Sequence, residues 1–292
     1  MSRGATAPVR SVGLVPHRHR PVAQELARKA ASWLRERGVT VRVCEEDVEP
    51  GSLDEIACRR GEFAAGLDLA VSLGGDGTML RTVDLVYEDG AAVLGVNVGQ
   101  MGYLTEVEPA DLDHALERLI TGDFEVDERM VLEITVGSHG SAAGRWWALN
   151  EAVLEKAPGG RVVRLEVAIN GTPFTTYVAD GVIAATPTGS TAYSFSARGP
   201  IVSPRHRCLL LTPVSPHMLF DRSLVLDADE ELRFTVTDAR SALLTLDGRD
   251  LGILDAGDTV TCTGGPKPAR VVTFGPRDFH QILKAKFGLA DR

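Results

Sequence analysis

The sequence predicts a two-domain α/β protein, with an N-terminal Rossmann-like domain built on a parallel sheet and a C-terminal β-rich, β-sandwich-like domain. Three observations support this prediction. A chain of 292 residues suits one large domain or two ordinary ones. Apolar strand segments alternate with helical segments as far as residue 125, which favours a parallel sheet covered on both faces. Beyond that point, short β-branched runs alternate with turn residues every ~8–12 positions, which is typical of a sandwich.

The elements of the first domain, expected over 1–125, follow from hydrophobic periodicity. Apolar runs predict strands at 12–15, 67–73 and 91–98, and apolar residues at alternate positions predict a further strand at 39–44. Apolar residues at helical spacing predict three helices between and after them, at 21–37, 79–87 and 111–120. Ligands of such sheets gather where the strands end, so the loops after the strands are the first place to look for a site.

The second domain, expected over 126–275, is predicted from a series of short strands. Candidate strands lie at 131–136, 146–154, 162–169, 182–185, 209–211, 232–236, 243–246 and 271–274. One helix is expected among them, at 191–197. A last helix, at 279–287, lies in the interval 276–292, which we expect to pack back on the first domain.

Charge and hydropathy exclude two classes of partner. The chain has 31 basic and 40 acidic residues, a net charge of −9, whereas nucleic acids and anionic membranes require a cationic face. The longest apolar runs are far shorter than the ~20 residues that cross a bilayer, and the first residues lack the apolar core of a signal peptide. We expect neither nucleic acid nor membrane as a partner, although a local basic pocket is compatible with this balance.

The cysteines indicate a reducing compartment. Cys44, Cys58, Cys208 and Cys262 are scattered, with no C-x-x-C pair and no histidine nearby at ligand spacing. A disulfide framework or a structural zinc site is therefore not expected. We expect a cytoplasmic protein with four reduced thiols.

The strongest local signal is the turn Gly74–Thr78 (GGDGT), which follows a predicted strand and precedes a predicted helix. Backbone amides and the helix dipole at such a point favour anions, and glycines let phosphate oxygens approach the backbone. Asp76 is unusual there, because a carboxylate repels phosphate. It fits a group that accepts a proton from a hydroxyl or holds magnesium on the phosphates. The alternative is a tight turn in which Asp76 caps the helix.

Two further segments have the residue types of a binding site. In Asp180–Ser194, Pro187 and Gly189 break the strand, so that several hydroxyls gather at the start of the next helix, and Tyr193 could stack on a ring. Asn150-Glu151 stands at the end of an apolar run, where an amide and a carboxylate suit ribose hydroxyls or an adenine amino group. The alternatives are a capped helix start and a solvated strand end.

Other motifs have simpler interpretations. His17–Arg20 (HRHR) could be a phosphate patch, but a solvated basic loop is the favoured interpretation. His217, in a proline-rich loop, is more typical of a turn than of a catalytic site. The sequence lacks four common motifs: the P-loop, G-x-G-x-x-G, G-x-S-x-G and H-E-x-x-H. Their absence speaks against the nucleotide-binding folds, hydrolases and zinc proteases that carry them.

Taken together and in this order, these segments resemble the NAD kinases, the family that phosphorylates the adenosine 2′-hydroxyl of NAD to make NADP. The resemblance extends over 11–287. Its segments are Gly74–Thr78, Gly95–Thr105, Asn150-Glu151, Asp180–Ser196, Leu211–Leu219 and Asp247-Gly248. The GGDGT turn alone also occurs in lipid and sphingoid kinases, whereas the sequence of Asp180–Ser196 is much more specific.

The resemblance implies a role for each matching residue. Asp76 is expected as the general base on the 2′-hydroxyl, with Gly77 beside the substrate and Arg81 near the dinucleotide. Asn150 and Glu151 are expected to hold the adenosine half of NAD, and Asp180 its nicotinamide end. Further contacts with the dinucleotide are implied for Arg161, Thr191, Ala192, Tyr193, Ser194, Phe195, Ser196, Asp247 and Arg249. The expected phosphate-binding residues are Gly74, Gly75, Gly77 and Thr78.

The resemblance also implies cofactors and partners. Family members use ATP as phosphoryl donor with a divalent metal, normally magnesium, and are commonly homodimers or homotetramers. We therefore expect NAD and either ATP or polyphosphate as small-molecule partners, with no side chain assigned to the metal. The sequence leaves the choice of donor open.

The chain departs from the family pattern at three positions. Arg198 replaces a glycine of the usual Ala-Gly-Gly-Pro, Arg249 stands where glutamine is common, and Val178 stands where some members have arginine. These changes leave the preference for NAD or NADH open. Two alternatives also stay open: a lipid or sphingoid kinase that shares the GGDGT turn, and a regulator that binds a dinucleotide without catalysis. The net charge of −9 speaks against the lipid enzyme.

Overall fold

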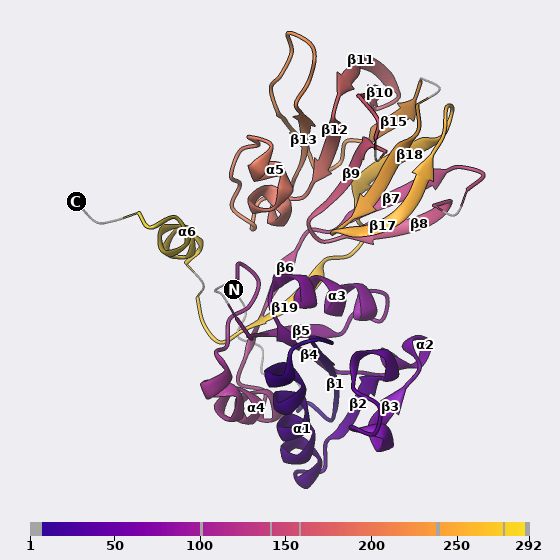
Figure 1. Ribbon diagram of the computed structural model, residues 1–292. Helices are drawn as coiled ribbons and strands as arrows, with labels where there is room; N and C mark the ends of the chain where they lie inside the picture. The colour runs from indigo at the N-terminus through magenta and orange to yellow at the C-terminus, as the bar shows by residue number, and fades with distance from the viewer. Residues whose placement is uncertain are drawn as a thin grey trace. The chain divides into compact units, whose positions relative to one another are not determined.

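The computed structural model describes residues 8–99, 102–140, 142–157, 159–237, 240–276 and 278–289. Gln100 and Met101 of the Gly95–Thr105 segment lie outside this part of the chain. The described residues form two compact units (Figure 1). Unit 1 combines the chain up to Glu128 with the chain from Ala269 onward, and unit 2 is Arg129–Pro268.

Unit 1 is built on a mixed seven-stranded sheet in the order β3-β2-β1-β4-β5-β19-β6. Its strands are β1 (Ser11–Pro16), β2 (Thr40–Cys44), β3 (Ala57–Cys58), β4 (Leu69–Gly74), β5 (Ala92–Asn97), β6 (Glu125–Arg129) and β19 (Ala269–Thr273). Strands β3, β2, β1, β4, β5 and β19 are parallel. Strands β4 and β5 are buried along their whole length, as expected of a parallel sheet covered on both faces.

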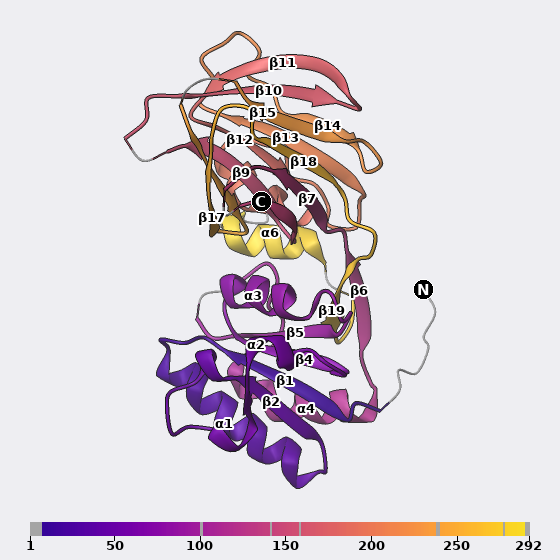
Figure 2. The same cartoon turned by 90° about the vertical axis from the view of Figure 1, so that its right-hand side faces the viewer.

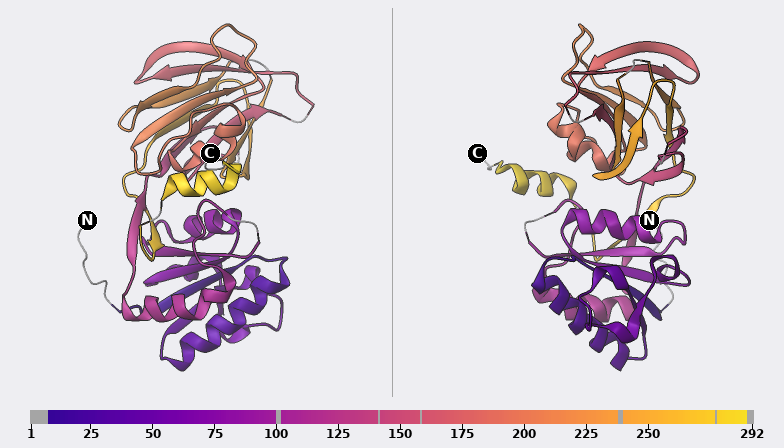
Figure 3. Two further views of the ribbon diagram at one scale, coloured as in Figure 1. Left: turned by 90° about the vertical axis from the view of Figure 1, so that its left-hand side faces the viewer. Right: turned by 45° about the vertical axis from the view of Figure 1, so that its right-hand side comes forward.

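Helices α1 (Pro21–Glu36), α2 (Arg60–Phe63), α3 (Asp76–Val86) and α4 (Leu112–Thr121) cover both faces of this sheet (Figure 3). Helix α6 (Phe279–Phe287) follows β19 in the chain. Helices α1 and α4 pack together on one face, and α2 and α3 lie on the other. Apolar residues of α1 and α4 join those of the strands in one core. Gly122 ends α4 with a φ of 75°, a conformation that glycine adopts without strain.

Strand β19 corrects one sequence-based assignment. The run 271–274 was expected in the β-rich domain, but Ala269–Thr273 pairs with β5 in the sheet of unit 1, where Val271 lies opposite Val93. A β-branched run has the same composition in either sheet, so its partner is set by long-range pairing that periodicity does not record.

The C-terminal helix forms where it was expected. Asp278 caps α6 by accepting hydrogen bonds from the backbone N–H groups of His280, at 2.9 Å, and Gln281, at 3.3 Å. The ammonium group of Lys286 lies 4.3 Å from the centre of the Tyr103 ring, which links the helix to the loop after β5. None of the residues of α6 is buried, so the helix contributes little to the apolar core of unit 1.

Unit 2 contains two antiparallel six-stranded sheets (Figure 2). The first has the order β11-β10-β15-β18-β7-β8, and its strands are β7 (Leu132–Gly137), β8 (Gly144–Ala148), β10 (Val163–Ile169), β11 (Thr172–Ala179), β15 (Leu232–Val236) and β18 (Thr259–Gly264). The second has the order β14-β13-β12-β9-β16-β17, and its strands are β9 (Glu151–Lys156), β12 (Gly181–Ala185), β13 (Cys208–Val214), β14 (Leu224–Asp227), β16 (Ala242–Leu246) and β17 (Arg249–Leu254).

A single apolar core lies between the two sheets of unit 2. Phe234 and Leu165 of the first sheet and Leu154 and Leu244 of the second are fully buried in it. This is the packing of a sandwich, in which the inward residues of alternating strands interdigitate. The outer face of the second sheet has a smaller cluster, covered in part by Ala197 and Val202.

The chain passes from one sheet to the other at Leu149-Asn150. The run 146–154 was predicted as one strand, but it forms β8 in the first sheet and β9 in the second. Both parts are apolar enough to be strands, and the bend between them depends on contacts with distant residues that are described below. Among the described residues, no helix combines the length and hydropathy needed to span a membrane.

Candidate active site

The turn from Gly74 to Thr78 presents unpaired backbone N–H groups. Strand β4 ends at Gly74, Gly75 precedes the first helical residue, and Asp76 begins α3. The N–H groups of Asp76, Gly77 and Thr78 donate to no described residue. A Cβ atom on Gly75 or Gly77 would have no atom within 4 Å. These amides therefore face open space at a helix N-terminus, where an anion is favoured.

The carboxylate of Asp76 is held by a loop that is distant in sequence. Its Oδ2 accepts a hydrogen bond from the backbone N–H of Tyr103 at 2.8 Å, and its Oδ1 accepts one from Leu104 at 3.0 Å. It makes no capping bond to its own helix, so the capping interpretation of Asp76 is wrong. Each oxygen keeps lone pairs for a further partner.

Gly102 is required by this arrangement. A Cβ atom at position 102 would lie 2.1 Å from Oδ1 of Asp76 and 2.7 Å from Oγ1 of Thr105. Only glycine leaves room for the carboxylate at its present position. Sequence analysis placed Gly102 within a family motif without finding this role.

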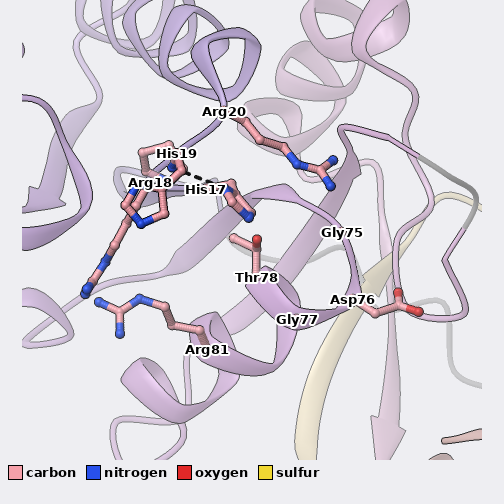
Figure 4. A pocket seen from close by; sticks show the side chains of 10 residues that line it. His17, Arg18, His19, Arg20, Gly75, Asp76, Gly77, Thr78 and Arg81 are labelled. Atoms are coloured by element: carbon pink, nitrogen blue, oxygen red, sulfur yellow. Dashed lines mark hydrogen bonds between the residues drawn. The ribbon is translucent and has the colours of Figure 1, made fainter. Parts of the chain in front are cut away.

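A pocket of about 460 Å³ opens beside the turn (Figure 4). Its lining consists of Pro16, His17, Arg18, His19, Arg20, Gly75, Asp76, Gly77, Thr78 and Arg81. The lining thus contains three arginines and two histidines but one carboxylate, although the whole chain has a net charge of −9. The geometry and charge suit a phosphate chain.

The loop His17–Arg20 is one wall of this pocket. Sequence analysis favoured a solvated basic loop, and its arginines are indeed exposed, but the loop also lines the pocket. The backbone N–H of His19 donates to Nδ1 of His17 at 3.2 Å, which leaves Nε2 to hold the ring proton of neutral His17. Burial, helped by the charge of Arg20, lowers the pKa of His17. The neutral ring is therefore favoured near pH 7 and presents a hydrogen-bond donor.

Arg81 lies in the same pocket, on the first turns of α3. Its Nε and Nη2 atoms donate to the carboxylate of Asp47 at 3.0 Å, and its Nη2 also pairs with Glu46 at 2.8 Å. The residue is expected near the dinucleotide from the resemblance, and the structure places it in the pocket beside the Gly74–Thr78 turn.

In unit 2, one carboxylate fixes the bend between β8 and β9. Asp247 accepts hydrogen bonds from the backbone N–H groups of Leu149, Asn150 and Glu151, at 2.7, 2.8 and 3.0 Å. Its own backbone has a φ of 49°, which aspartate tolerates better than most residues. Asp247 thereby positions Asn150 and Glu151, and its oxygens are largely occupied by this task.

Glu151 is a buried carboxylate, not the solvated strand end that one sequence interpretation suggested. It is 7% exposed, and its Oε1 accepts a hydrogen bond from the N–H of Tyr193 at 3.2 Å. Its Oε2 is buried without a partner. Burial raises the pKa of Glu151 to about 7, against the hydrogen bonds from Tyr193 and Ser194, and the nearby Asp247 raises it further. A buried acceptor of this kind is ready for a ligand donor.

The segment after β12 wraps over the start of β9. Thr186 Oγ1 donates to the carbonyl of Leu149 at 2.6 Å, and a Cβ on Gly189 would lie 2.1 Å from the carbonyl oxygen of Asn150. In place of the predicted helix over 191–197, the chain forms a 3₁₀ turn, η4 (Thr188–Thr191), and then the short helix α5 (Tyr193–Ser196). Ala192 between them has neither helical nor regular strand geometry.

The side chains of this segment divide into two groups. Tyr193 and Phe195 are each 38% exposed, and Thr191, Ala192 and Ser196 are also accessible. Ser194 is fully buried and shares a hydrogen bond of 3.0 Å with Thr212. The aromatic rings are therefore available to a planar ligand, whereas the hydroxyl of Ser194 already has a partner.

The remaining predicted residues of unit 2 are dispersed. Asp180 forms an ion pair of 2.8 Å with Lys156 of β9. The guanidinium of Arg249, at the start of β17, lies 5.6 Å from the Trp146 ring centre. Arg161 is exposed in a bend before β10, with no hydrogen bond or ion pair to any described residue. The structure thus joins Asn150, Glu151, Tyr193 and Asp247 through hydrogen bonds and leaves Arg161 apart.

The residues present fit a magnesium ion that arrives on a nucleotide. Mg²⁺ in phosphoryl-transfer sites is held by one or two carboxylates together with substrate phosphates. The pocket offers the single carboxylate of Asp76. Among the described residues, the one group with metal-ligand spacing is Cys44, Glu46 and Asp47. Both of its carboxylates are already paired with arginines, so it does not suit a cation.

Comparisons with known proteins cover most of the chain. The family model of the ATP-NAD kinase N-terminal domain matches residues 12–124, and that of the ATP-NAD kinase C-terminal domain matches 149–274. The chain is 43% identical to the NAD kinase of Heliobacterium modesticaldum, over 94% of this chain and 98% of that protein. It is 37% identical to NAD kinase 2 of Streptomyces coelicolor, over 96% and 95%.

Solved structures share the fold. The yeast NADH kinase complexed with NADH superposes with a TM-score of 0.89 at 25% identity, covering 98% of this chain and 89% of that one. An NAD kinase from Archaeoglobus fulgidus in complex with ATP gives a TM-score of 0.72 at 23% identity, covering 95% and 97%. The second likeness concerns the fold alone.

The buried Glu151 predicts a specific pH dependence of stability. Because its pKa is raised in the folded state, its stabilising contribution is complete below the unfolded pKa of ~4.3 and is lost as the pH rises through about 7. Compared with Glu151→Gln, the wild type should lose about 2–3 kcal/mol of unfolding free energy between pH 5 and pH 8. Urea unfolding of both proteins at each pH measures this difference.

The control is Glu166→Gln, which removes an exposed carboxylate from β10 of the same unit. It should follow the wild-type curve across this pH range. Parallel curves for the wild type and Glu151→Gln would contradict the prediction.

Proposed function

The chain belongs to the NAD kinase family and phosphorylates NAD to NADP, and on this premise we propose how its residues divide the work. We infer that the pocket at the start of α3 takes the phosphate chain of the donor, ATP or polyphosphate, and that Asp76 is the general base. The observation that supports this most is the fixed carboxylate of Asp76 beside three unpaired helix amides. Membership of the family removes the lipid kinase and the non-catalytic regulator as alternatives.

The proposed step moves one proton and one phosphoryl group. The adenosine 2′-hydroxyl of NAD gives its proton to Asp76, and its oxygen forms a bond to the terminal phosphorus of the donor. The bond from that phosphorus to the bridging oxygen breaks, so that ADP, or the shortened polyphosphate, leaves. Such a transfer depends mainly on positioning and charge neutralisation. The hydrogen bonds from Tyr103 and Leu104 supply the positioning of the base.

The charge of the donor would be neutralised by residues of unit 1. The N–H groups of Gly77 and Thr78 would donate to phosphate oxygens, and the guanidinium groups of Arg18 and Arg81 would add positive charge. Magnesium bound to the donor would supply further neutralisation of its phosphates. Gly74 and Gly75 would allow the close approach of these oxygens to the backbone.

The residues of unit 2 are proposed to hold NAD. Asn150 and Glu151 would bind the adenosine half, where Oε2 of Glu151 offers a buried acceptor without a partner. The exposed faces of Tyr193 and Phe195 would contact flat parts of the ligand. Asp247 would act by holding the bend that presents Asn150 and Glu151.

Seven residues are assigned more from the resemblance than from geometry. Asp180 is proposed at the nicotinamide end, with Lys156 as its present partner. Thr191, Ala192 and Ser196 would line the dinucleotide beside the two rings, and Ser194 would support them from within. Arg161 and Arg249 would contact the ligand from an exposed bend and from the start of β17.

We also propose that the chain forms a homodimer or homotetramer, as the resemblance implies. Unit 2 exposes the rings of Phe174 and Phe220, whose centres lie 5.8 Å apart, and Val225 nearby in sequence is 57% exposed. Adjacent exposed rings are typical of a protein interface. Light scattering after gel filtration measures the mass, and a monomer at micromolar concentration would contradict this proposal.

The cytoplasm is the proposed location. All four cysteines are free, and Cys44, Cys208 and Cys262 are buried. Free thiols and soluble phosphate donors suit a reducing compartment that contains ATP. Fractionation of the source cells, with detection by antibody, tests this location.

The base assignment predicts the effect of Asp76→Asn. The amide still fits the pocket but cannot accept the proton, so kcat should fall by roughly 10²–10⁴-fold, while KM for NAD changes little. NADP is measured with a dehydrogenase that requires it, after incubation with NAD, ATP and magnesium. Near-normal turnover of Asp76→Asn would reject Asp76 as the base.

The positioning of the base predicts the effect of Gly102→Ala. The new methyl group would displace the carboxylate of Asp76, so kcat should fall by about tenfold or more through loss of geometry alone. Gly61→Ala is the matched control, because a Cβ at position 61 in α2 would have no atom within 4 Å. Equal turnover of the two variants would show that the position of Asp76 is not limiting.

A further inference from the structure

Asp47 is a buried carboxylate that contacts two arginines of the basic pocket. It ends the short 3₁₀ turn η1 (Glu45–Asp47), and its side chain is completely inaccessible to solvent. The Nε atom of Arg18 donates to its Oδ1 at 2.9 Å, and Arg81 donates through Nε and Nη2 at 3.0 Å each. One carboxylate thus holds the two guanidinium groups next to each other, as they are seen in Figure 4.

The position of Asp47 is itself fixed. The side-chain amide of Gln24, which is 2% exposed, donates to the carbonyl of Asp47 at 2.9 Å and to the carbonyl of His17 at 3.3 Å. Gln24 therefore ties the turn containing Asp47 to the loop His17–Arg20. Loss of these partners would leave an uncompensated buried charge and strongly destabilise the folded state. The hydrogen bonds between Asp47 and its two arginines are therefore expected to persist.

Both guanidinium groups keep hydrogen-bond donors for a ligand. The Nη1 atoms of Arg18 and Arg81 have no partner among the described residues, and both side chains line the pocket. Arginine presents its donors in a planar fork that matches phosphate oxygens, provided that the plane is fixed. The bonds to Asp47 fix the plane at the Nε edge, and the Nη1 atoms keep their donors for a ligand.

We propose that Asp47 is a positioning residue for the phosphoryl donor: it orients Arg18 and Arg81 so that they bind the phosphate chain in the pocket. The inference rests on the proposed donor site and deepens it. Asp47 contacts no substrate in this arrangement, and its effect reaches the donor through the two arginines.

Glu46 offers a charge-matched comparison within the same cluster. Its two oxygens also bridge the arginines, at 2.8 Å from Nη2 of Arg81 and 3.2 Å from Nη2 of Arg18, but its side chain is 40% exposed. Coulomb's law alone predicts that neutralising either acid tightens the binding of an anion. Positioning predicts that the two variants differ: neutralising Asp47 weakens the binding of the anion, whereas neutralising Glu46 does not. The reason is that only Asp47 fixes the Nε edges of the arginines.

The test is calorimetric titration of the full-length protein with inorganic tripolyphosphate, and in parallel with a non-hydrolysable ATP analogue and magnesium. Asp47→Asn should raise the Kd of both ligands by about tenfold or more, the usual loss when charge-assisted hydrogen bonds to an anion are no longer oriented. Glu46→Gln should leave the Kd unchanged or lower it. Equal or tighter binding by Asp47→Asn would overturn the inference.

A second variant covers the case in which Asp47→Asn does not fold. Asp47→Glu keeps the charge but moves the carboxylate by one methylene group. Positioning therefore predicts weaker tripolyphosphate binding, whereas a pure charge effect predicts unchanged binding. Thermal melting shows whether each variant folds, and the KM for NAD, which both variants should leave near the wild-type value, reports whether unit 2 is intact. Unchanged tripolyphosphate binding by folded Asp47→Glu would also count against the inference.

A double-mutant cycle identifies the route of the effect. If Asp47 acts through Arg81, then adding Asp47→Asn to Arg81→Lys should weaken tripolyphosphate binding by a smaller factor than it does in the wild type. Full additivity would overturn action through Arg81.

Failure of this inference and failure of the proposed function can be told apart by experiment. Wild-type protein that makes NADP from ATP but does not bind tripolyphosphate in the pocket would overturn the inference and leave the activity. Wild-type protein that makes no NADP from either donor, yet binds tripolyphosphate in an Asp47-dependent manner, would reject the proposed donor chemistry and leave the positioning role.

Discussion

Hydrogen bonds from backbone amides to one aspartate carboxylate in each unit determine where the functional residues lie. In unit 1, the amides of Tyr103 and Leu104 hold Asp76 in place. In unit 2, Asp247 holds the amides of Leu149, Asn150 and Glu151. The bonds are charge-assisted, and they join residues 27 or more positions apart in unit 1 and 96 or more in unit 2. Tyr103, Leu104, Leu149 and Asn150 lie in bends outside the helices and strands, so their positions depend on these carboxylates.

The two carboxylates have different consequences for chemistry. Asp76 is the held group, and each of its oxygens keeps a lone pair for a further partner, as a proton acceptor requires. Asp247 is the holding group, and the residue that it positions is Glu151, whose buried Oε2 stays without a partner. In both units a rigid support positions a polar group that the fold leaves incompletely satisfied, which is typical of a binding or catalytic site.

The distribution of charge shows why composition alone is a poor guide to the pocket. The chain has a net charge of −9, but the loop after β1 and the first turns of α3 place three arginines around one cavity. Glu46 and Asp47 compensate two of these charges from behind. A local positive site therefore coexists with an acidic protein, because pairing is decided at the scale of a few ångströms.

The sequence by itself determined the fold class, most of the elements, and the GGDGT turn with Asp76, because hydrophobic periodicity and turn residues are local properties. The helix at 279–287 and the buried strands β4 and β5 are examples. Only the tertiary structure decided that 269–273 joins the first sheet, that the run 146–154 bends between two sheets, and that His17–Arg20 lines a pocket. It alone also showed the roles of Gly102 and Asp47, since each depends on a contact with a residue far away in the chain. Short-range patterns record which residues are apolar or flexible, whereas the partner of a buried carboxylate is fixed only when distant segments pack together.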